Sequence, residues 1–82
     1  MARYRRQSPK KLGNKMREIR LRLDMTQEEV AKYLKTDSGS ISRYECGLRD
    51  PSLLELLAFS RMSGVGMEVL VDDKMNLAKR LR

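Results

Sequence analysis

The chain has 82 residues and a formal net charge of +7, with 18 Lys and Arg against 11 Asp and Glu. This length fits one domain, near the lower limit at which an apolar core is stable without a disulfide or a metal. With one cysteine, Cys46, and no histidine, the chain lacks a possible internal disulfide and the usual zinc spacings, and no apolar run approaches the roughly 20 residues of a membrane span.

Residues 1–7, MARYRRQ, are expected to form a mobile basic arm, because they show no apolar periodicity. Residues 1–23 contain nine Lys and Arg against one acid, whereas residues 24–71 contain five against eight. Positive charge concentrated at one end suits a polyanion, either nucleic acid or an anionic membrane surface. A solvated tail that keeps a small protein soluble is the simpler alternative, and composition alone does not separate the two.

The first helix is predicted to start at Ser8 and Pro9, which suit an N-cap followed by proline in the first turn. Apolar residues then recur at helical spacing, and the helix is expected to end near Leu23. Asp24 suits a left-handed position after this end, because aspartate tolerates that conformation better than most residues. The apolar residues of this stripe are Leu12, Met16, Ile19 and Leu23.

A capping box, Thr26-Gln27-Glu28-Glu29, opens a second short helix, which Lys35 and Thr36 interrupt. Its inner face is predicted to consist of Val30, Ala31 and Leu34. Asp37 then caps a third helix over residues 38–45, and Gly47 suits its C-terminal end. In this third helix Ile41 and Tyr44 are expected to face inward.

Asp50 and Pro51 predict the start of a fourth, strongly apolar helix over residues 52–63, which Gly64 ends. Residues 66–71, GMEVLV, are expected to form a last short helix, although the alternation of Met67, Val69 and Val71 also suits a strand. Residues 72–82 form a tail in which Leu77 and Leu81, four apart, suit a docked turn.

Two short helices joined by a tight turn are the arrangement that places a second helix in the major groove of DNA. The outward side of the second helix must then be polar and uncrowded, and Ser38, Gly39, Ser42 and Arg43 meet this demand. Glycine in a helix costs up to about 1 kcal/mol relative to alanine. Close approach to another backbone is one reason to accept that cost.

From Leu12 to about Val71 the sequence resembles the Cro/CI (XRE) family of helix-turn-helix regulators. The resemblance lies in TQEEVAKYL for the first helix of the motif, SISRYECG for the recognition helix, and DPSLLELLAFSRMSGVGMEVL for the two helices that follow. It implies an all-α, five-helix bundle of the lambda-repressor-like type over residues 8–71, flanked by the basic arm and by the tail 72–82.

The resemblance also implies roles for matched positions. Base or groove contacts fall to Ser38, Gly39, Ser42 and Arg43, and phosphate contacts to Gln27, Ser40 and Lys35. Arg20 and Glu45 match an ion pair that ties the first helix to the recognition helix, against the alternative of two unrelated surface charges. The family often has glycine at the positions of Lys35 and Asp24, so this chain departs from the pattern at both loops.

Base readout at the start of the recognition helix is expected to be sparse, because serine and glycine replace residues that bond bases in bidentate fashion. Arg43 alone could do so, and a phosphate clamp is an equal alternative for it. Arg3, Arg5 and Arg6 of the arm could reach an adjacent minor groove, where arginine responds to groove width. The alternative for the arm remains a solvated tail.

The expected function is sequence-specific binding of double-stranded DNA as a transcriptional regulator, with repression as the expected mode and residues 38–46 as the recognition helix. The resemblance implies a homodimer on a palindromic operator, with an interface expected among Met67, Val69, Leu70, Val71, Leu77 and Leu81.

An enzyme is not expected, nor is a cofactor, a metal or a membrane partner. The location is expected to be cytoplasmic, of bacterial or phage type, and nucleoid-associated. Two alternatives remain open: an antitoxin-type module that holds a toxin and binds DNA secondarily, and an RNA-binding protein.

Overall fold

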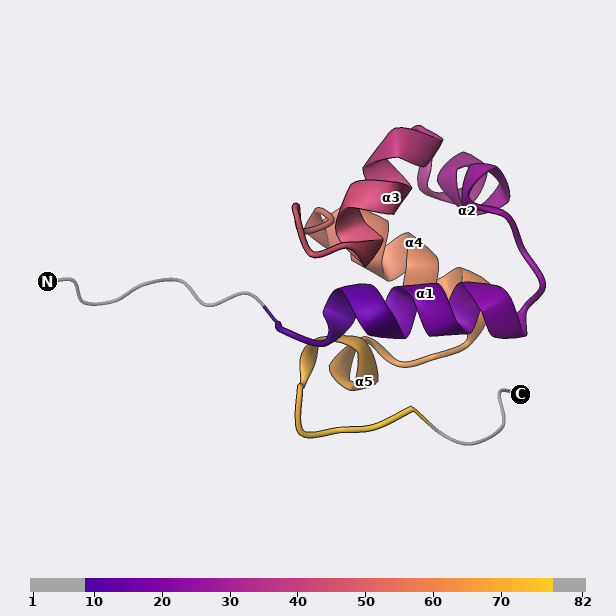
Figure 1. The fold of residues 1–82 in the computed structure, drawn as a ribbon. Helices are drawn as coiled ribbons and strands as arrows, with labels where there is room; N and C mark the ends of the chain where they lie inside the picture. The colour runs from indigo at the N-terminus through magenta and orange to yellow at the C-terminus, as the bar shows by residue number, and fades with distance from the viewer. Residues whose placement is uncertain (1–8, 78–82) are drawn as a thin grey trace, which may run out of the picture.

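The computed structural model describes residues 9–77, and within this range the backbone forms five α-helices. They are α1 (Leu12–Arg22), α2 (Gln27–Leu34), α3 (Ser38–Glu45), α4 (Leu53–Ser63) and α5 (Met67–Val71). Figure 1 shows α2 and α3 together on one side of α1, with α5 on the other side. The predicted all-α, five-helix architecture is therefore confirmed, and residues 66–71 contain a helix rather than a strand.

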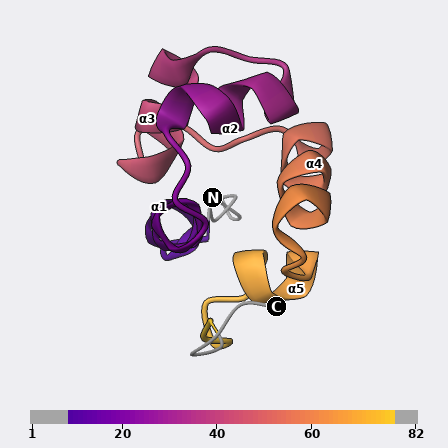
Figure 2. The same ribbon diagram turned by 90° about the vertical axis from the view of Figure 1, so that its right-hand side faces the viewer.

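The core lies between α1 and the remaining helices. Figure 2 shows α1 nearly end-on, with α2 and α3 above it and α4 and α5 beside it. The fully buried side chains come from all five helices. Full burial of one such side chain contributes about 1.5–3 kcal/mol to folding. The largest are Phe59, Met16, Ile19, Ile41, Leu70 and Val30.

The predicted caps at α2 and α3 are present. The Thr26 side chain accepts a hydrogen bond from the Glu29 amide while the Glu29 carboxylate accepts one from the Thr26 amide. Asp37 accepts from the amide of Ser40 at the start of α3. Each such cap satisfies backbone donors that the first helical turn leaves without partners.

The start of α4 differs from the prediction at Asp50 and Pro51. The helix begins at Leu53 because Ser52 and Glu55 form a second capping box, in which each side chain bonds the other's backbone amide. The S-x-x-E spacing satisfies two amides at once, so it prevails over the preceding Asp-Pro pair.

The start of α1 was also wrongly predicted, because the helix begins at Leu12 rather than after Pro9. The amides of Lys10 and Lys11 donate to the two carboxylate oxygens of Asp73, at 2.9 and 3.0 Å. Within α1, Nζ of the buried Lys15 likewise donates, to the carbonyl oxygens of Val69 and Asp72, at 2.6 and 2.9 Å. Asp73 thus binds the amides just before α1, while Lys15 binds carbonyl oxygens at the end of α5.

We expect Asp73→Asn to flatten the acid limb of the stability profile. The amide hydrogen bonds, from Lys10 first and Lys11 next, lower the pKa of Asp73 below its ordinary value. A carboxylate with a lowered folded-state pKa stabilises the fold above its unfolded pKa of about 4, and that contribution is lost as the pH falls through the folded pKa. Melting temperatures measured from about pH 5 downward should therefore fall less steeply in the variant, and equal slopes would contradict the capping role.

The apolar residues assigned to a dimer interface are largely used within the monomer. Leu70 has no exposed surface, so its assignment to an interface was wrong. Met67, Val69 and Leu77 are half-buried against the core, and Val71 is 36% exposed. Leu81 lies outside the described residues.

The two loops that lack the expected glycines contain residues in the left-handed region. Asp24 has a φ of 57° and Lys35 has a φ of 59°. Gly47, which follows the end of α3, also lies in the left-handed region, with a φ of 78°. The predicted left-handed Asp24 and the terminating Gly47 are therefore confirmed. At Lys35 the β-carbon makes this conformation costly by about 1–2 kcal/mol.

Lys35→Gly should raise the free energy of unfolding by about 1 kcal/mol, because glycine adopts this conformation without that cost. Lys32→Gly, inside α2, provides the opposite control and should lower it by about 1 kcal/mol. Urea denaturation of the two variants measures the difference. A loss of stability in both would show that the left-handed turn stores no strain.

Candidate DNA-binding surface

Helix α3 presents a polar outer side and an anchored inner side. Ile41 and Tyr44 are buried as predicted, and Ser40 and Glu45 are buried beside them. Gly39 and Arg43 are exposed, and Ser38 and Ser42 are half-exposed. The four residues predicted to contact bases thus lie together on the accessible side of one short helix.

A buried carboxylate, Glu45, connects this helix to α1 and α2. Its Oε2 accepts a hydrogen bond from Arg20 Nε at 2.7 Å, and its Oε1 accepts one from Arg20 Nη2 at 3.2 Å. Gln27 Nε2 donates to the same Oε1 at 3.1 Å, and Arg20 Nη1 donates to the carbonyl oxygen of Met25. The ion pair expected between Arg20 and Glu45 is present, and it also orients the side chain of Gln27.

A second connection joins α3 to α4. The hydroxyl of Tyr44 donates to Glu55 Oε1 at 2.7 Å. The same oxygen accepts from the Ser52 amide in the capping box of α4. Burial, and then the Glu55 carboxylate, raise the pKa of Tyr44. Arg49 lies over the Tyr44 ring, with its guanidinium carbon 5.8 Å from the ring centre. Helix α3 is therefore fixed at its C-terminal turn by charged and polar contacts to three other helices.

The predicted phosphate contacts differ in their placement. Lys35 is exposed, whereas Gln27 is half-exposed and its side-chain amide donates to the buried Glu45. Ser40 is only 5% exposed, because it lies on the same side of α3 as Tyr44. Its burial is inconsistent with the phosphate contact that we expected. Arg3, Arg5 and Arg6 lie outside the described residues.

Sequence reasoning missed several of the contacts that hold the helices together. Glu55 could have been found from the capping-box spacing S-L-L-E at residues 52–55. Gln27 was assigned to a phosphate, but its hydrogen bond to Glu45 was not expected. Asp73 had no local signal, because its partners lie more than 60 positions away in the chain.

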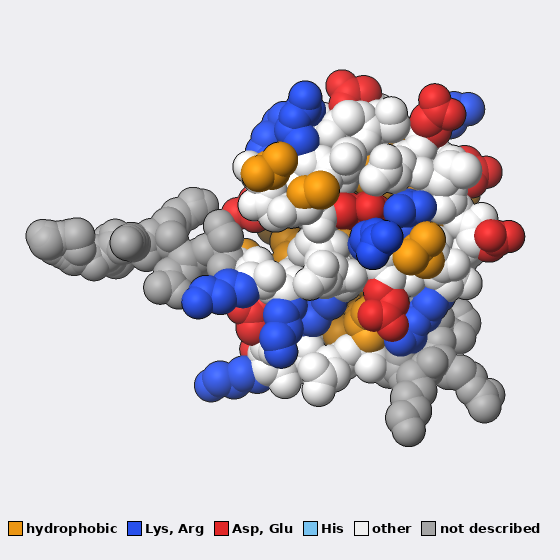
Figure 3. All heavy atoms as spheres, in the orientation of Figure 1, with side chains coloured by type: hydrophobic (Ala, Val, Ile, Leu, Met, Phe, Trp, Pro, Cys, Tyr) orange, Lys and Arg blue, Asp and Glu red, His pale blue; other side chains and the backbone are white. Residues whose placement is uncertain are grey.

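Charged side chains of both signs are interspersed on the face of the molecule that Figure 3 shows. Figure 3 shows Lys and Arg at several separate places on one face, with acidic side chains between them. Of residues 9–77, none belongs to a cluster of three metal-ligating side chains. The helices in this range are all too short or too polar to cross a membrane.

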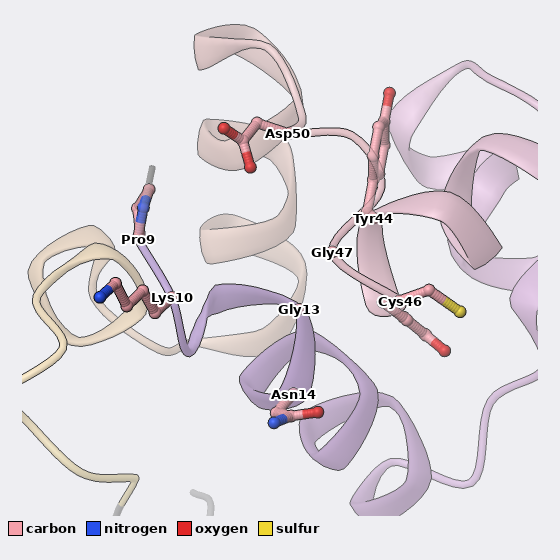
Figure 4. Close-up of a pocket in the computed structure, with 9 residues that line it drawn as sticks. Pro9, Lys10, Gly13, Asn14, Tyr44, Cys46, Gly47 and Asp50 are labelled. Atoms are coloured by element: carbon pink, nitrogen blue, oxygen red, sulfur yellow. The ribbon is translucent and has the colours of Figure 1, made fainter. Parts of the chain in front are cut away.

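A pocket of about 320 Å³ is lined by residues at the start of α1 and at the end of α3. Figure 4 shows Gly13 and Asn14 of α1 across from Tyr44, Cys46 and Gly47. A β-carbon on Gly13 would lie 2.5 Å from the Tyr44 carbonyl oxygen and 2.8 Å from that of Glu45. The absence of a side chain at Gly13 therefore allows the backbones of α1 and α3 to approach each other.

Comparisons with known proteins agree with this architecture. The sequence is 33% identical over 60 residues to the HTH-type transcriptional regulator ImmR of Bacillus subtilis (strain 168), an alignment that covers 73% of this chain and 47% of ImmR. The chain thus spans about half the length of the curated relative it matches. The structure resembles that of the P22 c2 repressor, which was solved in complex with a synthetic operator, with a TM-score of 0.72 and 24% identity over 76% of this chain and 94% of that chain.

The family assignment rests on the sequence of the helical region itself. A profile described as helix-turn-helix matches residues 16–70, which extend from the middle of α1 to α5 and include both α2 and α3. This range is more than half of the chain, and the Cro/CI-type resemblance is confirmed by it. The chain therefore belongs to the helix-turn-helix family.

Proposed function

We propose that this protein binds double-stranded DNA in a sequence-specific manner and regulates transcription, with repression as its mode. The observation that carries the proposal is the outer side of α3, which is polar, accessible and fixed to three other helices. An α-helix with these properties fits the major groove, where base edges differ in their donors and acceptors. The relatives named above are a transcriptional regulator and a repressor, so they support this function and give no support to an antitoxin role.

Within this proposal the residues of α2, α3 and the turn between them divide into two classes. Ser38, Gly39, Ser42 and Arg43 face base edges, and Gln27 and Lys35 bind phosphates at the edges of the motif. Arg43 carries most of the direct readout, because it alone among the four offers several donors in a planar group. The phosphate contacts supply affinity but no sequence information.

One module of this size with few base contacts gives modest specificity, so we propose that two copies bind paired half-sites about one helical turn apart. A soluble, cytoplasmic protein associated with the nucleoid is the corresponding setting. Selection of bound duplexes from a random pool tests the function and the symmetry together. A palindromic consensus is expected, and failure to enrich any duplex at moderate salt would overturn the function.

The basic arm is proposed to contact the minor groove beside the site of α3 through Arg3, Arg5 and Arg6. Deletion of residues 1–7 should then weaken binding to the selected duplex and reduce the slope of log K against log salt by roughly 0.9 for each phosphate that the arm neutralises. Titrations at several salt concentrations measure both quantities. An unchanged affinity with an unchanged slope would mean that the arm is a solvated tail.

A further inference from the structure

At the start of α3 the Asp37 carboxylate and the Arg43 guanidinium lie on the same side of Gly39. The position that a β-carbon would occupy on Gly39 lies 3.5 Å from Asp37 Oδ1 and 3.7 Å from Arg43 Nη1. Gly39 and Arg43 are four positions apart on the helix, so their side-chain positions lie on one face. The Arg43 side chain therefore extends back along the helix, and its guanidinium occupies space that a larger residue at position 39 would take.

Asp37 has a function at this place besides the guanidinium. Its Oδ1 accepts the capping hydrogen bond from the Ser40 amide at 2.7 Å. This bond is the main reason that the pKa of Asp37 is lowered, and the positive charges of Arg43 and then Arg49 lower it further. The carboxylate is ionised at neutral pH and attracts Arg43 through space across Gly39, without a direct ion pair between the two side chains.

We propose that Asp37 is a positioning residue for Arg43, which it holds over the bare backbone of Gly39 at the end of α3 that enters the DNA groove. The inference rests on the proposed function, and it concerns how that function obtains specificity from one arginine. An arginine side chain has many rotamers, and fixing it before binding reduces the ordering cost that binding would otherwise include. Its five N–H donors allow it to face Asp37 and a base at the same time.

Asp37→Asn separates this role from capping, because asparagine caps helices as well as aspartate does. Removal of the negative charge should by itself strengthen binding to every duplex to a similar degree, because phosphate attraction carries no sequence information. Loss of positioning should instead reduce discrimination at the base pair that Arg43 contacts. The ratio of affinities between duplexes therefore distinguishes the two effects.

The probes are the duplex that the wild-type protein enriches from a random pool and its single-base-pair variants. Arg43→Ala identifies the position at which discrimination depends on that arginine. Asp37→Asn should reduce discrimination about tenfold at this same position, within the range of one bidentate contact, and leave the other positions unchanged. Asp24→Asn, which removes an equal charge from the exposed loop between α1 and α2, should leave this position unchanged.

A second measurement needs no DNA and detects the positioning in the free protein. Nitrogen-15 relaxation of the Arg43 Nε–H group should show greater order than that of Arg17, which is exposed on α1, and Asp37→Asn should abolish the difference. Equal mobility of Arg43 and Arg17 in the wild-type protein would overturn the proposal.

The DNA-binding measurements can also contradict the positioning role of Asp37. Retained discrimination in Asp37→Asn, with all duplexes bound more tightly to the same extent, would show that Asp37 is only a cap and a charge. An Arg43→Ala variant that relaxes no position would also overturn the inference while leaving DNA binding in place. If the wild-type protein enriches no duplex, the proposed function fails and the positioning role fails with it.

Discussion

Arg20→Ala should lower the free energy of unfolding by about 3 kcal/mol, because it leaves the carboxylate of Glu45 buried without a counter-charge. The Glu45 side chain is only 4% exposed and the Arg20 side chain 12%, so water cannot replace the missing guanidinium without a local rearrangement. The substitution also removes the hydrogen bond to the Met25 carbonyl oxygen in the loop before α2. Urea denaturation followed by circular dichroism measures the change.

Two further variants show which part of this loss is electrostatic. Replacing both partners by methionine should be less destabilising than Arg20→Ala, because a buried ion pair can often be exchanged for apolar groups at little cost. Arg22→Ala removes an arginine that pairs with Glu18 at the surface of the same helix, and should cost less than about 1 kcal/mol. If the double variant is as unstable as Arg20→Ala, loss of the hydrogen bonds to Met25 and Gln27 rather than the unpaired charge dominates.

The same cluster predicts a consequence for DNA binding. Glu45 also accepts from Gln27, which is a proposed phosphate contact at the start of α2. Loss of Arg20 therefore disturbs the orientation of α3 and of Gln27 together. At a temperature where the Arg20→Ala variant remains folded, its affinity for a selected duplex should still be lower than that of the wild-type protein.

The elements of this fold that could be predicted are those with local signals. The capping box at Thr26 and Glu29, the cap at Asp37 and the left-handed Gly47 and Gly64 each depend on residues within a few positions of one another. The start of α1 could not be predicted in this way. The amides of Lys10 and Lys11, just before the helix, bond Asp73, which is more than 60 positions away in the chain.

The candidate site was predictable in its periodicity and not in its contacts. Period 3.6 placed Ile41 and Tyr44 inside and Arg43 outside, as the structure shows. It also places Ser40 next to Tyr44 on the inner side, although the polarity of a serine favours a solvent-facing position. The position of the Arg43 guanidinium beside Gly39 depends on the rotamer of a long side chain, which sequence spacing does not determine.

Gly13→Ala is expected to lower the free energy of unfolding by about 1–3 kcal/mol, the usual cost of overpacking. Its new β-carbon would meet the carbonyl oxygens of Tyr44 and Glu45, at 2.5 and 2.8 Å. These are backbone atoms, so relief requires α1 to move away from α3 rather than a side chain to rotate. Such a movement would also strain the hydrogen bonds between Arg20 and Glu45, which join the same two helices.

Gly39→Ala is the matched control, because it makes the same chemical change within a helix where the new β-carbon meets only ordinary contacts of 3.5 and 3.7 Å. Alanine is the better helix former, so this variant should gain up to about 1 kcal/mol. The two substitutions thus have opposite expected signs, which thermal and urea denaturation can distinguish. If both raised stability alike, α1 and α3 would not be in close backbone contact, and the pocket between them would have room for a side chain.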